Sequence, residues 1–348
     1  MGLGFFAKDM GIDLGTANTL IYLKGKGIVL NEPSVIAVEA ANGKLIATGF
    51  RAKEMVGKAP DNIRVVSPLQ DGVISDFDMT AEMLKNFISK ALDEKTRFGK
   101  LRVVVGVPSG VTEVEKRAVE EVVRQMGGKE VYVMEEPMAA AIGADLAVDE
   151  PVGCMIADIG GGTSDIAIIA LGGIVTSNSL RHAGDKFDEA IIQYMRRKYS
   201  LLIGNKTAEE LKVTVGCAIV DVDSDGFEVM KKMDAKGRDI VTGLPKTVSV
   251  RSRDMQDALE EPIEVVIDGI KTTLENAPPE LAADIVTNGL VLSGGGGLIS
   301  NLDKLIEMRT GLHVHVADNA FEAVAVGTGK SLANIEKLKR YVMTRKNR

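Results

Sequence analysis

The chain has 348 residues, of which 45% are hydrophobic, and it carries a formal net charge of −7. The acidic balance and the aromatic content of only 4% argue against a nucleic-acid partner, and no stretch approaches the roughly 18 consecutive uncharged apolar residues of a membrane span. At roughly 150 residues per domain, the length predicts two domains. Two cysteines imply no disulfide framework, which indicates a cytoplasmic protein.

The first predicted element is a pair of strands within "MGIDLGTANTLIYL", residues 10–23. An apolar strand reaches Asp13, a short Gly/Thr turn follows, and a second apolar strand begins. Further along, residues 101–108, "LRVVVGVP", have the composition of a buried strand. Strand-like and helix-like segments then alternate, which is typical of an α/β fold.

A helix is predicted over residues 111–128, with Thr112 and Glu115 at capping-box spacing and Gly127 at its end. Apolar residues recur every four positions along it, and we expect them to form its buried face: Val114, Ala118, Val122 and Met126. A strand is predicted over 130–134. A second helix is predicted over 136–147, with Pro137 in its first turn.

The segment "MIADIGGGTSDIAIIA", residues 155–170, repeats the design of the first strand pair. Its Asp158 lies 145 positions after Asp13, which is a domain-sized spacing. Duplication of a domain explains such a period better than a short solenoid repeat does. We therefore expect two related α/β halves that face each other.

Three consecutive glycines, Gly160 to Gly162, interrupt the second strand pair. Glycine weakens a strand interior, but it permits positive φ angles and the close approach of a phosphate to backbone N–H groups. Thr163 adds a hydroxyl, and the two aspartates fit a Mg²⁺ ion held through water. A single turn of this kind is equally consistent with an ordinary hairpin, whereas two copies favour a shared phosphate clamp.

A third glycine-rich element is "GLVLSGGGGLISNLDKLIEM", residues 289–308, which reads as strand, loop and helix. It is neither a Walker A sequence nor G-x-G-x-x-G. Backbone at Gly294 to Gly297 could lie against a flat base. A flexible connector is the alternative, although four glycines exceed what a connector needs.

The order of these motifs resembles a known superfamily. "DLGTAN", "EEPMAAAIG", "DIGGGTSD" and "LSGGGGLI" match the order of the phosphate-1, connect-1, phosphate-2 and adenosine motifs of the actin/sugar-kinase/DnaK-chaperone superfamily. "NTLIYLKGKGIVLNEPSVIA" and "PLQDGVISDFD" are closer still to the MreB/Mbl family of bacterial actin-like shape-determining proteins. The resemblance spans roughly residues 9–331.

This resemblance implies ATP and Mg²⁺ as cofactors, with Asp13 and Asp158 holding the metal through water. It implies a set of nucleotide-binding residues: Asp13, Gly15, Thr16, Ala17, Asn18, Gly160, Gly161, Gly162, Thr163, Gly184, Asp185, Glu209, Glu210, Lys212, Gly294, Gly295, Gly296 and Gly297. Thr207 is expected to cap the helix that presents Glu209, Glu210 and Lys212. The alternatives are a solvated Glu/Lys face for this helix and a simple helix-capping role for Asp185.

The resemblance also implies catalytic roles for Glu136, Thr163 and Asp158. Glu136 follows a strand and precedes Pro137, where a carboxylate can orient the attacking water or accept its proton. Capping of the following helix is the alternative role for Glu136.

The implied fold is an actin-like ATPase with two facing, duplicated, ribonuclease-H-like α/β domains, each with a smaller insertion. Domain I would comprise residues 1–145 and 321–348, with an insertion at about 32–75. Domain II would comprise 146–320, with an insertion at about 186–245. A sugar kinase would need an acceptor pocket and a chaperone would need a substrate domain; the short chain after Gly297 favours a filament protein instead.

By the same resemblance, the expected partners are other copies of the chain in homopolymeric filaments, the inner face of the cytoplasmic membrane, and cell-wall elongation proteins. Leu3, Phe5 and Phe6 could insert into the membrane as a small wedge, and Phe98 lies where relatives carry a hydrophobic loop. The tail "KLKRYVMTRKNR" contains six Lys/Arg and no acid, so it is either attracted to anionic lipid or simply solvated.

Overall fold

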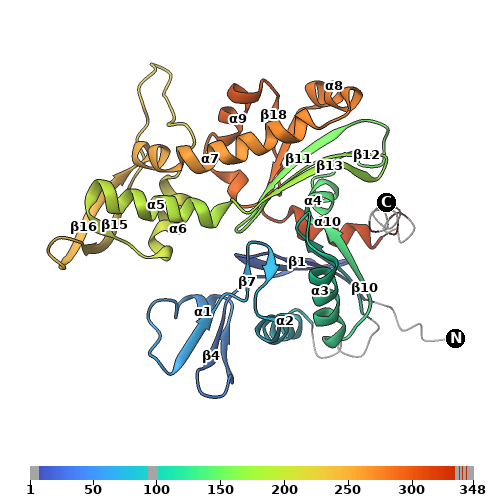
Figure 1. The fold of residues 1–348 in the computed structure, drawn as a ribbon, viewed down its shortest axis with the longest axis horizontal. Helices are drawn as coiled ribbons and strands as arrows, with labels where there is room; N and C mark the ends of the chain where they lie inside the picture. The colour runs from blue at the N-terminus through green and yellow to red at the C-terminus, as the bar shows by residue number, and fades with distance from the viewer. Residues whose placement is uncertain (1–7, 93–100, 334–336, 338, 340–341, 343–348) are drawn as a thin grey trace.

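A computed structural model describes residues 8–92 and 101–333, together with Lys337, Lys339 and Val342 (Figure 1). The proposed membrane residues Leu3, Phe5, Phe6 and Phe98, and most of the basic tail, lie outside the described residues. None of the helices within the described ranges is long and apolar enough to cross a membrane.

The first half of the molecule is built on a five-stranded sheet in the order β10-β9-β1-β2-β3. Strands β1 and β2 form an antiparallel hairpin, whereas β9 runs parallel to both β1 and β10. Its strands are β1 (Lys8–Leu14), β2 (Asn18–Leu23), β3 (Gly27–Pro33), β9 (Leu101–Val107) and β10 (Gly128–Glu135). Helices α2 (Phe77–Ala91) and α3 (Glu113–Gln125) share a core with this sheet.

The second half repeats this topology in a sheet with the order β13-β12-β11-β17-β18. Here β11 and β12 form the antiparallel hairpin, and β17 runs parallel to β11 and β18. Its strands are β11 (Cys154–Ile159), β12 (Ser164–Ala170), β13 (Gly173–Leu180), β17 (Leu290–Ser293) and β18 (Val314–Val316). The expected mixed α/β fold with two related halves is therefore confirmed.

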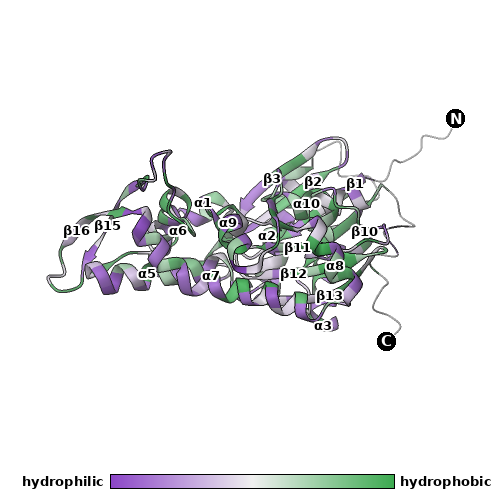
Figure 2. Cartoon of the chain, turned by 90° about the horizontal axis from the view of Figure 1, so that it is seen from above, coloured by the Kyte–Doolittle hydropathy of each residue, from purple (hydrophilic) through white to green (hydrophobic). Residues whose placement is uncertain are grey.

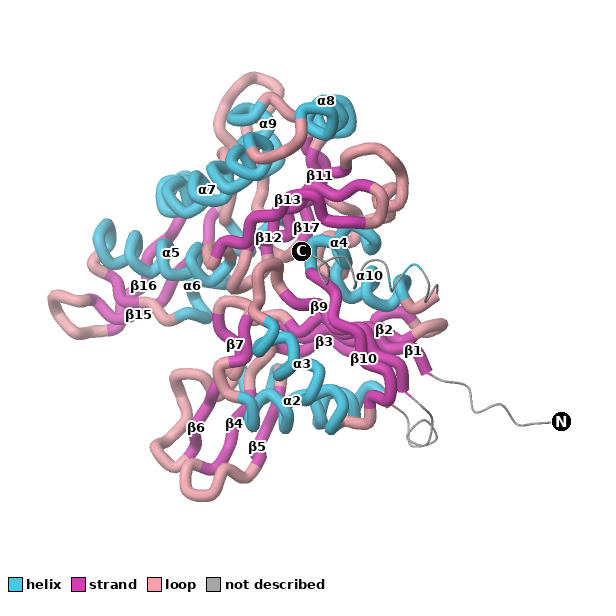
Figure 3. The backbone as a smooth tube through the Cα atoms, turned by 45° about the vertical axis from the view of Figure 1, so that its right-hand side comes forward, coloured by secondary structure: helices cyan, strands magenta, loops and turns pink. Residues whose placement is uncertain are grey.

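Two short helices, α4 (Glu136–Gly143) and α10 (Ala323–Ser331), lie between the two large sheets (Figure 3). Their apolar side chains form one core with residues of both sheets, including Val104 of β9 and Ile156 of β11. The small residues of α4 permit this, because an added methyl group at Gly143 would lie 1.9 Å from the Ala323 carbonyl oxygen of α10. The two halves are thus joined by a shared, closely packed layer.

The outer elements extend each half. In the second half these are α5 (Gly184–Tyr199), α7 (Ser252–Glu275), α8 (Pro279–Asn288) and α9 (Leu302–Thr310). Strands of the large sheets are largely apolar, whereas α5 and α7 carry polar stretches along their outer sides (Figure 2). This is the pattern of a sheet buried on both faces and covered by amphipathic helices.

Each half also carries a small three-stranded sheet. The first is β5-β4-β6, built from β4 (Ile36–Glu39), β5 (Leu45–Thr48) and β6 (Ile63–Val66), followed along the chain by the short hairpin of β7 (Leu69–Gln70) and β8 (Val73–Ile74). The second is β14-β15-β16, built from β14 (Leu201–Leu202), β15 (Lys232–Asp239) and β16 (Pro245–Arg251). Helix α1 (Phe50–Lys53) lies beside the first and α6 (Asn205–Val215) beside the second. The domain and insertion boundaries named above remain a prediction.

The helix expected over residues 111–128 forms, but its buried face differs from the expected one. The Thr112–Glu115 capping box is present. Val114, however, is 77% exposed, and the buried residues are Val119, Val122 and Val123. With 3.6 residues per turn, a repeat of four drifts about 40° at each step, so a long stripe of that period cannot stay on one face.

Candidate functional site

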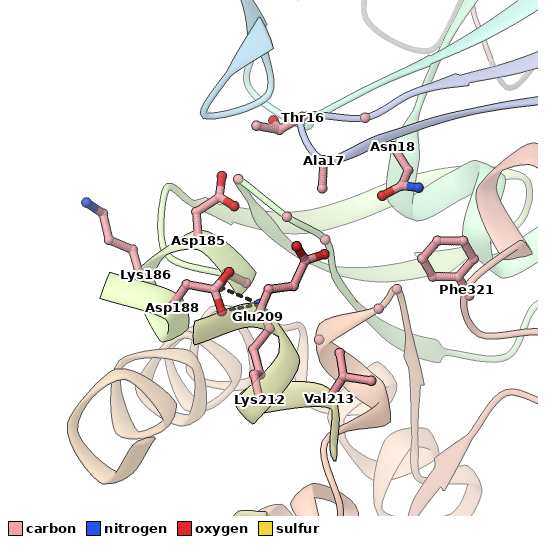
Figure 4. A pocket seen from close by; sticks show the side chains of 18 of the residues that line it. Thr16, Ala17, Asn18, Asp185, Lys186, Asp188, Glu209, Lys212, Val213 and Phe321 are labelled. Atoms are coloured by element: carbon pink, nitrogen blue, oxygen red, sulfur yellow. Dashed lines mark hydrogen bonds and ion pairs between the residues drawn. The ribbon is translucent and has the colours of Figure 1, made fainter. Parts of the chain in front are cut away.

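A cavity of about 1080 Å³ lies between the two halves, and both glycine turns contribute to its wall (Figure 4). The structure brings most of the predicted site residues together around it. Those that line it are Asp13, Gly15, Thr16, Ala17, Asn18, Glu136, Asp158, Gly160, Gly161, Gly162, Thr163, Gly184, Asp185, Glu209, Lys212, Gly294, Gly295 and Gly296.

Two predicted residues do not line the cavity. Glu210 is half-exposed and forms an ion pair with Lys206 on the same helix, at 3.8 Å. Gly297 is buried under the glycine loop, where an added Cβ would lie 3.5 Å from the Cβ of Leu292. Neighbouring positions on a helix or a tight loop point in different directions, so their sequence proximity to Glu209 and Gly296 does not bring them to the cavity.

The first turn, Gly15 to Ala17, is held from behind by Ser34. The Ser34 hydroxyl donates to the Gly15 carbonyl oxygen at 2.6 Å, and the Ser34 N–H donates to the Ala17 carbonyl oxygen at 3.0 Å. The N–H groups of Gly15, Thr16 and Ala17 donate no hydrogen bond within the part of the chain that the structure describes, so they are left to serve the cavity. No feature of the sequence marked Ser34 for this role.

The second turn, Gly160 to Thr163, is held in a similar way by the start of α5. The carbonyl oxygens of Gly160 and Gly161 accept from the N–H groups of Gly184 (3.1 Å) and Asp185 (2.8 Å). The N–H groups of Gly161 and Gly162 donate no hydrogen bond within the described part of the chain. Unpaired backbone N–H groups at the wall of a polar cavity form an anion-binding cradle.

Gly161 and Gly162 of the second turn are required by the close approach of the two halves. An added Cβ would lie 2.6 Å from the Cβ of Ala17 at Gly161, and 2.5 Å from the Oγ1 of Thr16 at Gly162. None of Gly160, Gly161 and Gly162 has a positive φ angle, so the expected conformational reason is wrong for them. Gly294 does have one, at +78°.

The tip of the β7–β8 hairpin adds a further contact to both turns. The Gly72 N–H donates to Thr16 Oγ1 at 2.9 Å, and an added Cβ at Gly72 would lie 2.9 Å from Thr163 Cγ2. Asp71 and Gly72 both have positive φ angles, of 48° and 76°. The sequence signal was available, because an Asp-Gly pair between short apolar runs indicates a tight hairpin turn.

Three carboxyl groups, those of Asp13, Glu136 and Asp158, line the base of the cavity, and that of Asp165 is buried beside Asp158. Burial and the neighbouring Asp158 raise the pKa of Asp13 to about 8, and burial raises the pKa of Asp158 to about 6. Burial also raises the pKa of Asp165 to about 7. The pKa of Glu136 is raised well above its usual value by burial, and then by the charges of Asp165, Asp13 and Asp158. The cluster favours a cation, which would offset this mutual repulsion.

The arrangement of these carboxylates suits a hydrated cation. The Ser293 hydroxyl donates to Asp158 Oδ1 at 2.7 Å and so fixes this carboxylate. Within the described ranges, no three His, Cys, Asp or Glu side chains are grouped closely enough to hold a metal ion by themselves. Oxygen donors supplemented by water and phosphate are what Mg²⁺ accepts, and Asp13 and Asp158 fit that donor set.

Two alternative capping roles are wrong. Glu135, not Glu136, is the N-cap residue of α4, so Glu136 lies in the first turn with its side chain at the cavity. Ala183 is the N-cap residue of α5, and Asp185 lies one residue inside the first turn. Thr207 does not cap α6 either, since Gly204 occupies that position. Burial raises the pKa of Asp185.

The far end of the cavity is polar on one side and apolar on the other (Figure 4). Lys212 Nζ donates to the Gly184 carbonyl oxygen at 2.8 Å and pairs with Asp188 at 2.9 Å, which ties α6 to α5. Gly295 lies against Phe321, whose ring carbon would be 3.4 Å from an added Cβ. A flat, partly apolar ligand group would fit beside Phe321 and the glycine loop.

An ion pair crosses the mouth of the cavity. Lys53 of α1 and Glu209 of α6 both line it, and their charged atoms lie 2.7 Å apart. The pair therefore connects the two small subdomains, one from each half. Sequence reasoning named Glu209 but not Lys53, because nothing local links positions 156 residues apart.

Comparisons with known proteins agree with this architecture. The family model described as MreB/Mbl protein matches residues 7–340. The chain is 48% identical to the cell shape-determining protein Mbl of Bacillus subtilis over 96% of this chain and 98% of that protein. It is 47% identical to the cell shape-determining protein MreB of Escherichia coli K12 over 96% of this chain and 95% of that one.

Solved structures are similar as well. MreB5 of Spiroplasma citri bound to AMPPNP superposes with a TM-score of 0.89 at 40% identity, covering 95% of this chain and 97% of that one. The ADP-bound form gives 0.88 at 38% identity, covering 96% and 98%. The MamK double helical filament, at 22% identity and TM-score 0.79 over 94% and 99%, shares the fold. The chain belongs to the MreB/Mbl family of actin-like, cell shape-determining proteins.

Proposed function

We propose that the protein binds Mg-ATP between its two halves, hydrolyses it slowly, and polymerises into membrane-associated filaments that help to determine cell shape by guiding cell-wall synthesis. The observation that carries this proposal is the pair of glycine turns, Gly15 to Ala17 and Gly160 to Thr163, which lie against each other at the wall of a cavity with an acidic base. The nucleotide-bound MreB5 structures support the choice of an adenine nucleotide.

In this proposal, the N–H groups of both turns receive the phosphate oxygens. The adenosine would lie toward the glycine loop and Phe321, beside α6, and the partly apolar lining there supports this. Asp13 and Asp158 would hold Mg²⁺, mainly through water, and the ion would supply positive charge to the phosphates. The domain boundaries given above, with 321–348 returning to the first domain, are part of the same proposal. The position of α10 beside α4 supports that return.

Hydrolysis would depend on Glu136 and Thr163. Glu136 can orient a water molecule and take its proton, and the Thr163 hydroxyl can hold the same water. Mg²⁺ held by Asp13 and Asp158 would offset two of the negative charges that raise the pKa of Glu136, and would therefore lower that pKa.

Filament formation distinguishes this function from that of a small-molecule kinase or a chaperone-type ATPase. The family membership and the cell shape-determining relatives favour a polymer. A head-to-tail contact that does not close into a ring generates an open filament. Subunit contacts would complete the hydrolytic site, so that hydrolysis depends on assembly.

The deciding experiment measures polymer and phosphate release as the protein is diluted in Mg-ATP. We expect sedimentable polymer and phosphate release to rise above one common critical concentration. A specific activity that stays constant on dilution, with no sedimentable polymer, would return the assignment to a small-molecule kinase.

The membrane part of the proposal rests on the resemblance and on the sequence of residues outside the described ranges. Anionic vesicles should lower the critical concentration, and deleting residues 1–8 should weaken that effect. Neutral vesicles are the control, because the basic tail has no attraction for an uncharged surface. Vesicles that leave the threshold unchanged would argue against membrane association.

A further inference from the structure

Two hydrogen bonds of Ser109 connect β12, the strand that follows the second turn, to the start of α4. Ser109, just beyond the end of β9, is 4% exposed, and Asp165 on β12 is fully buried. The Ser109 N–H donates to Asp165 Oδ1 at 2.7 Å. The Ser109 hydroxyl donates to Glu135 Oε2 at 2.9 Å. One residue of the first half therefore contacts the second half and the N-cap residue of α4 together.

Each end of this connection touches the proposed hydrolytic machinery. Asp165 lies two residues after Thr163 and pairs across the hairpin with Asp158. Glu135 directly precedes Glu136, and its side chain makes no capping bond to α4. The Glu135 side chain accepts from Ser109 instead, and its position sets where the first turn of α4 begins.

Packing along β9 supports the same connection. An added Cβ at Gly106 would lie 3.4 Å from Glu136 Cγ, so this strand passes directly against the Glu136 side chain. Pro108, between that strand and Ser109, contacts Gly72, which in turn lies against Thr163. A displacement of the second turn would thus reach the end of β9 through packing as well as through Asp165.

We propose that Ser109 is a positioning residue for hydrolysis: Asp165 holds its backbone, its hydroxyl holds Glu135, and these contacts tie Glu136 to the turn that carries Thr163. Ser109 and Asp165 do not line the cavity, so they act through Glu136. This inference rests on the proposed function, and it adds a connection by which arrival of phosphate at the second turn sets the position of the water-orienting carboxylate.

The test is Ser109→Ala in the full-length protein, which removes the hydroxyl and keeps the N–H that Asp165 accepts. We expect phosphate release per polymerised subunit to fall by about 10-fold to about 100-fold, since small misplacement of a catalytic group costs factors of this size. Mg-ATP affinity should stay within about 2-fold of wild type. Ser109→Thr, which restores a hydroxyl, should recover most of the rate.

A double-mutant cycle identifies the path. Glu135→Ala should lower the rate at least as much as Ser109→Ala does. Adding Ser109→Ala to Glu135→Ala should cause no further loss, because the hydrogen bond between the two side chains is already absent. Glu135→Gln keeps an acceptor oxygen and should retain most of the activity. Ser331→Ala is the matched control: this buried hydroxyl donates at 2.7 Å to a backbone oxygen in α10, outside the connection.

Three results would overturn the inference: an unchanged rate in Ser109→Ala, rate and affinity that fall together, or additive losses in the cycle. If Ser109→Ala does not fold, equal activity of Glu135→Ala and Glu135→Gln would overturn it instead. Glu136→Ala in the same assay distinguishes failure of the proposed hydrolytic role from failure of the positioning role of Ser109. A wild-type rate there contradicts the proposed hydrolytic role itself, whereas slow Glu136→Ala with normal Ser109→Ala contradicts only the positioning role.

Discussion

At the scale of single residues, the main feature of the site is a group of buried carboxyl groups that the fold places close together. Asp13, Glu136, Asp158 and Asp165 come from four different elements, and the pKa of each is raised. Buried like charges destabilise a folded protein unless they are protonated or offset by a cation. A cluster of this kind therefore lowers the stability of the protein without ligand and raises its affinity for a positively charged ligand.

The first prediction concerns the pH dependence of stability without nucleotide. The folded-state pKa values of about 8 for Asp13, about 6 for Asp158 and about 7 for Asp165 lie above 3.8, the ordinary pKa of an aspartate side chain. The folded state therefore binds more protons than the unfolded state across this window, so the free energy of unfolding falls as the pH rises from about 4 to about 8.

Asp13→Asn should flatten this fall between pH 6 and 8, by up to about 1.4 kcal/mol per pH unit for one proton. Urea unfolding at several pH values measures the effect, with Asp303→Asn in the first turn of α9, away from the cavity, as the control. A variant whose slope matches that of wild type would show that Asp13 does not titrate in this range.

Glu136 gives the second prediction. Glu136→Ala should leave Mg-ATP binding largely intact and slow phosphate release about 10²-fold to 10⁴-fold, the usual cost of losing a proton acceptor. Single-turnover phosphate release in preformed filaments measures it, and Glu130→Ala, on the same strand-to-helix unit but away from the cavity, is the control. Equal rates for Glu136→Ala and wild type would leave Glu136 without a catalytic role.

At the scale of elements, the β1–β2 and β11–β12 hairpins perform the same task with different supports. Ser34 holds the first turn and the start of α5 holds the second. In both turns, carbonyl oxygens accept hydrogen bonds from these supports, and the N–H groups of the turn are left for an anion. The turns also touch each other, and this contact explains why the second has glycine at positions 161 and 162.

A methyl group at the contact should therefore disturb both turns. Gly162→Ala should weaken Mg-ATP binding by at least about 10-fold, because its Cβ would lie 2.5 Å from Thr16 Oγ1 and 3.0 Å from the Asp71 Cα. Gly204→Ala is the control, since nothing lies within 4 Å of a Cβ there. Titration calorimetry of both variants measures the difference. Equal affinities would mean that the turns separate when nucleotide binds.

At the scale of the whole molecule, the two halves are joined at their base by α4 and α10 and across the cavity mouth by Lys53 and Glu209. The base is apolar and closely packed, whereas the mouth is bridged by an ion pair whose side chains are 36% and 41% exposed. Exposed pairs of this kind contribute about 0–1 kcal/mol. The mouth is therefore the weaker of the two connections.

Reversing one charge at the mouth should speed nucleotide release. We expect Lys53→Glu to release a fluorescent ATP analogue up to about 5-fold faster than wild type, and Lys53→Glu combined with Glu209→Lys to restore the rate. Lys116→Ala, which removes a pair within α3, is the control. Raising the salt concentration should reduce the difference. A double variant that stays as fast as Lys53→Glu would exclude this pairing.

The sequence by itself determined those features that depend on neighbouring residues. The two Asp-Gly-Thr hairpins, the Thr112 cap and the strands around 101–108 and 130–134 follow from local hydrogen bonding and side-chain period. The repetition of the hairpin at a domain-sized interval was enough to predict two halves and a shared phosphate clamp. The motif order then identified the family.

Only the tertiary structure decided which side chains meet. It placed Glu209 at the cavity and Glu210 in solvent, exposed Val114, and brought Ser34, Gly72 and Lys53 to the site. It also joined Ser109 to Asp165 and Glu135. These contacts link segments that are far apart in the chain. They form because burial of the apolar sheets determines where each strand ends, and therefore which side chains lie together. No local pattern carries that information, since it is a property of how the two halves pack.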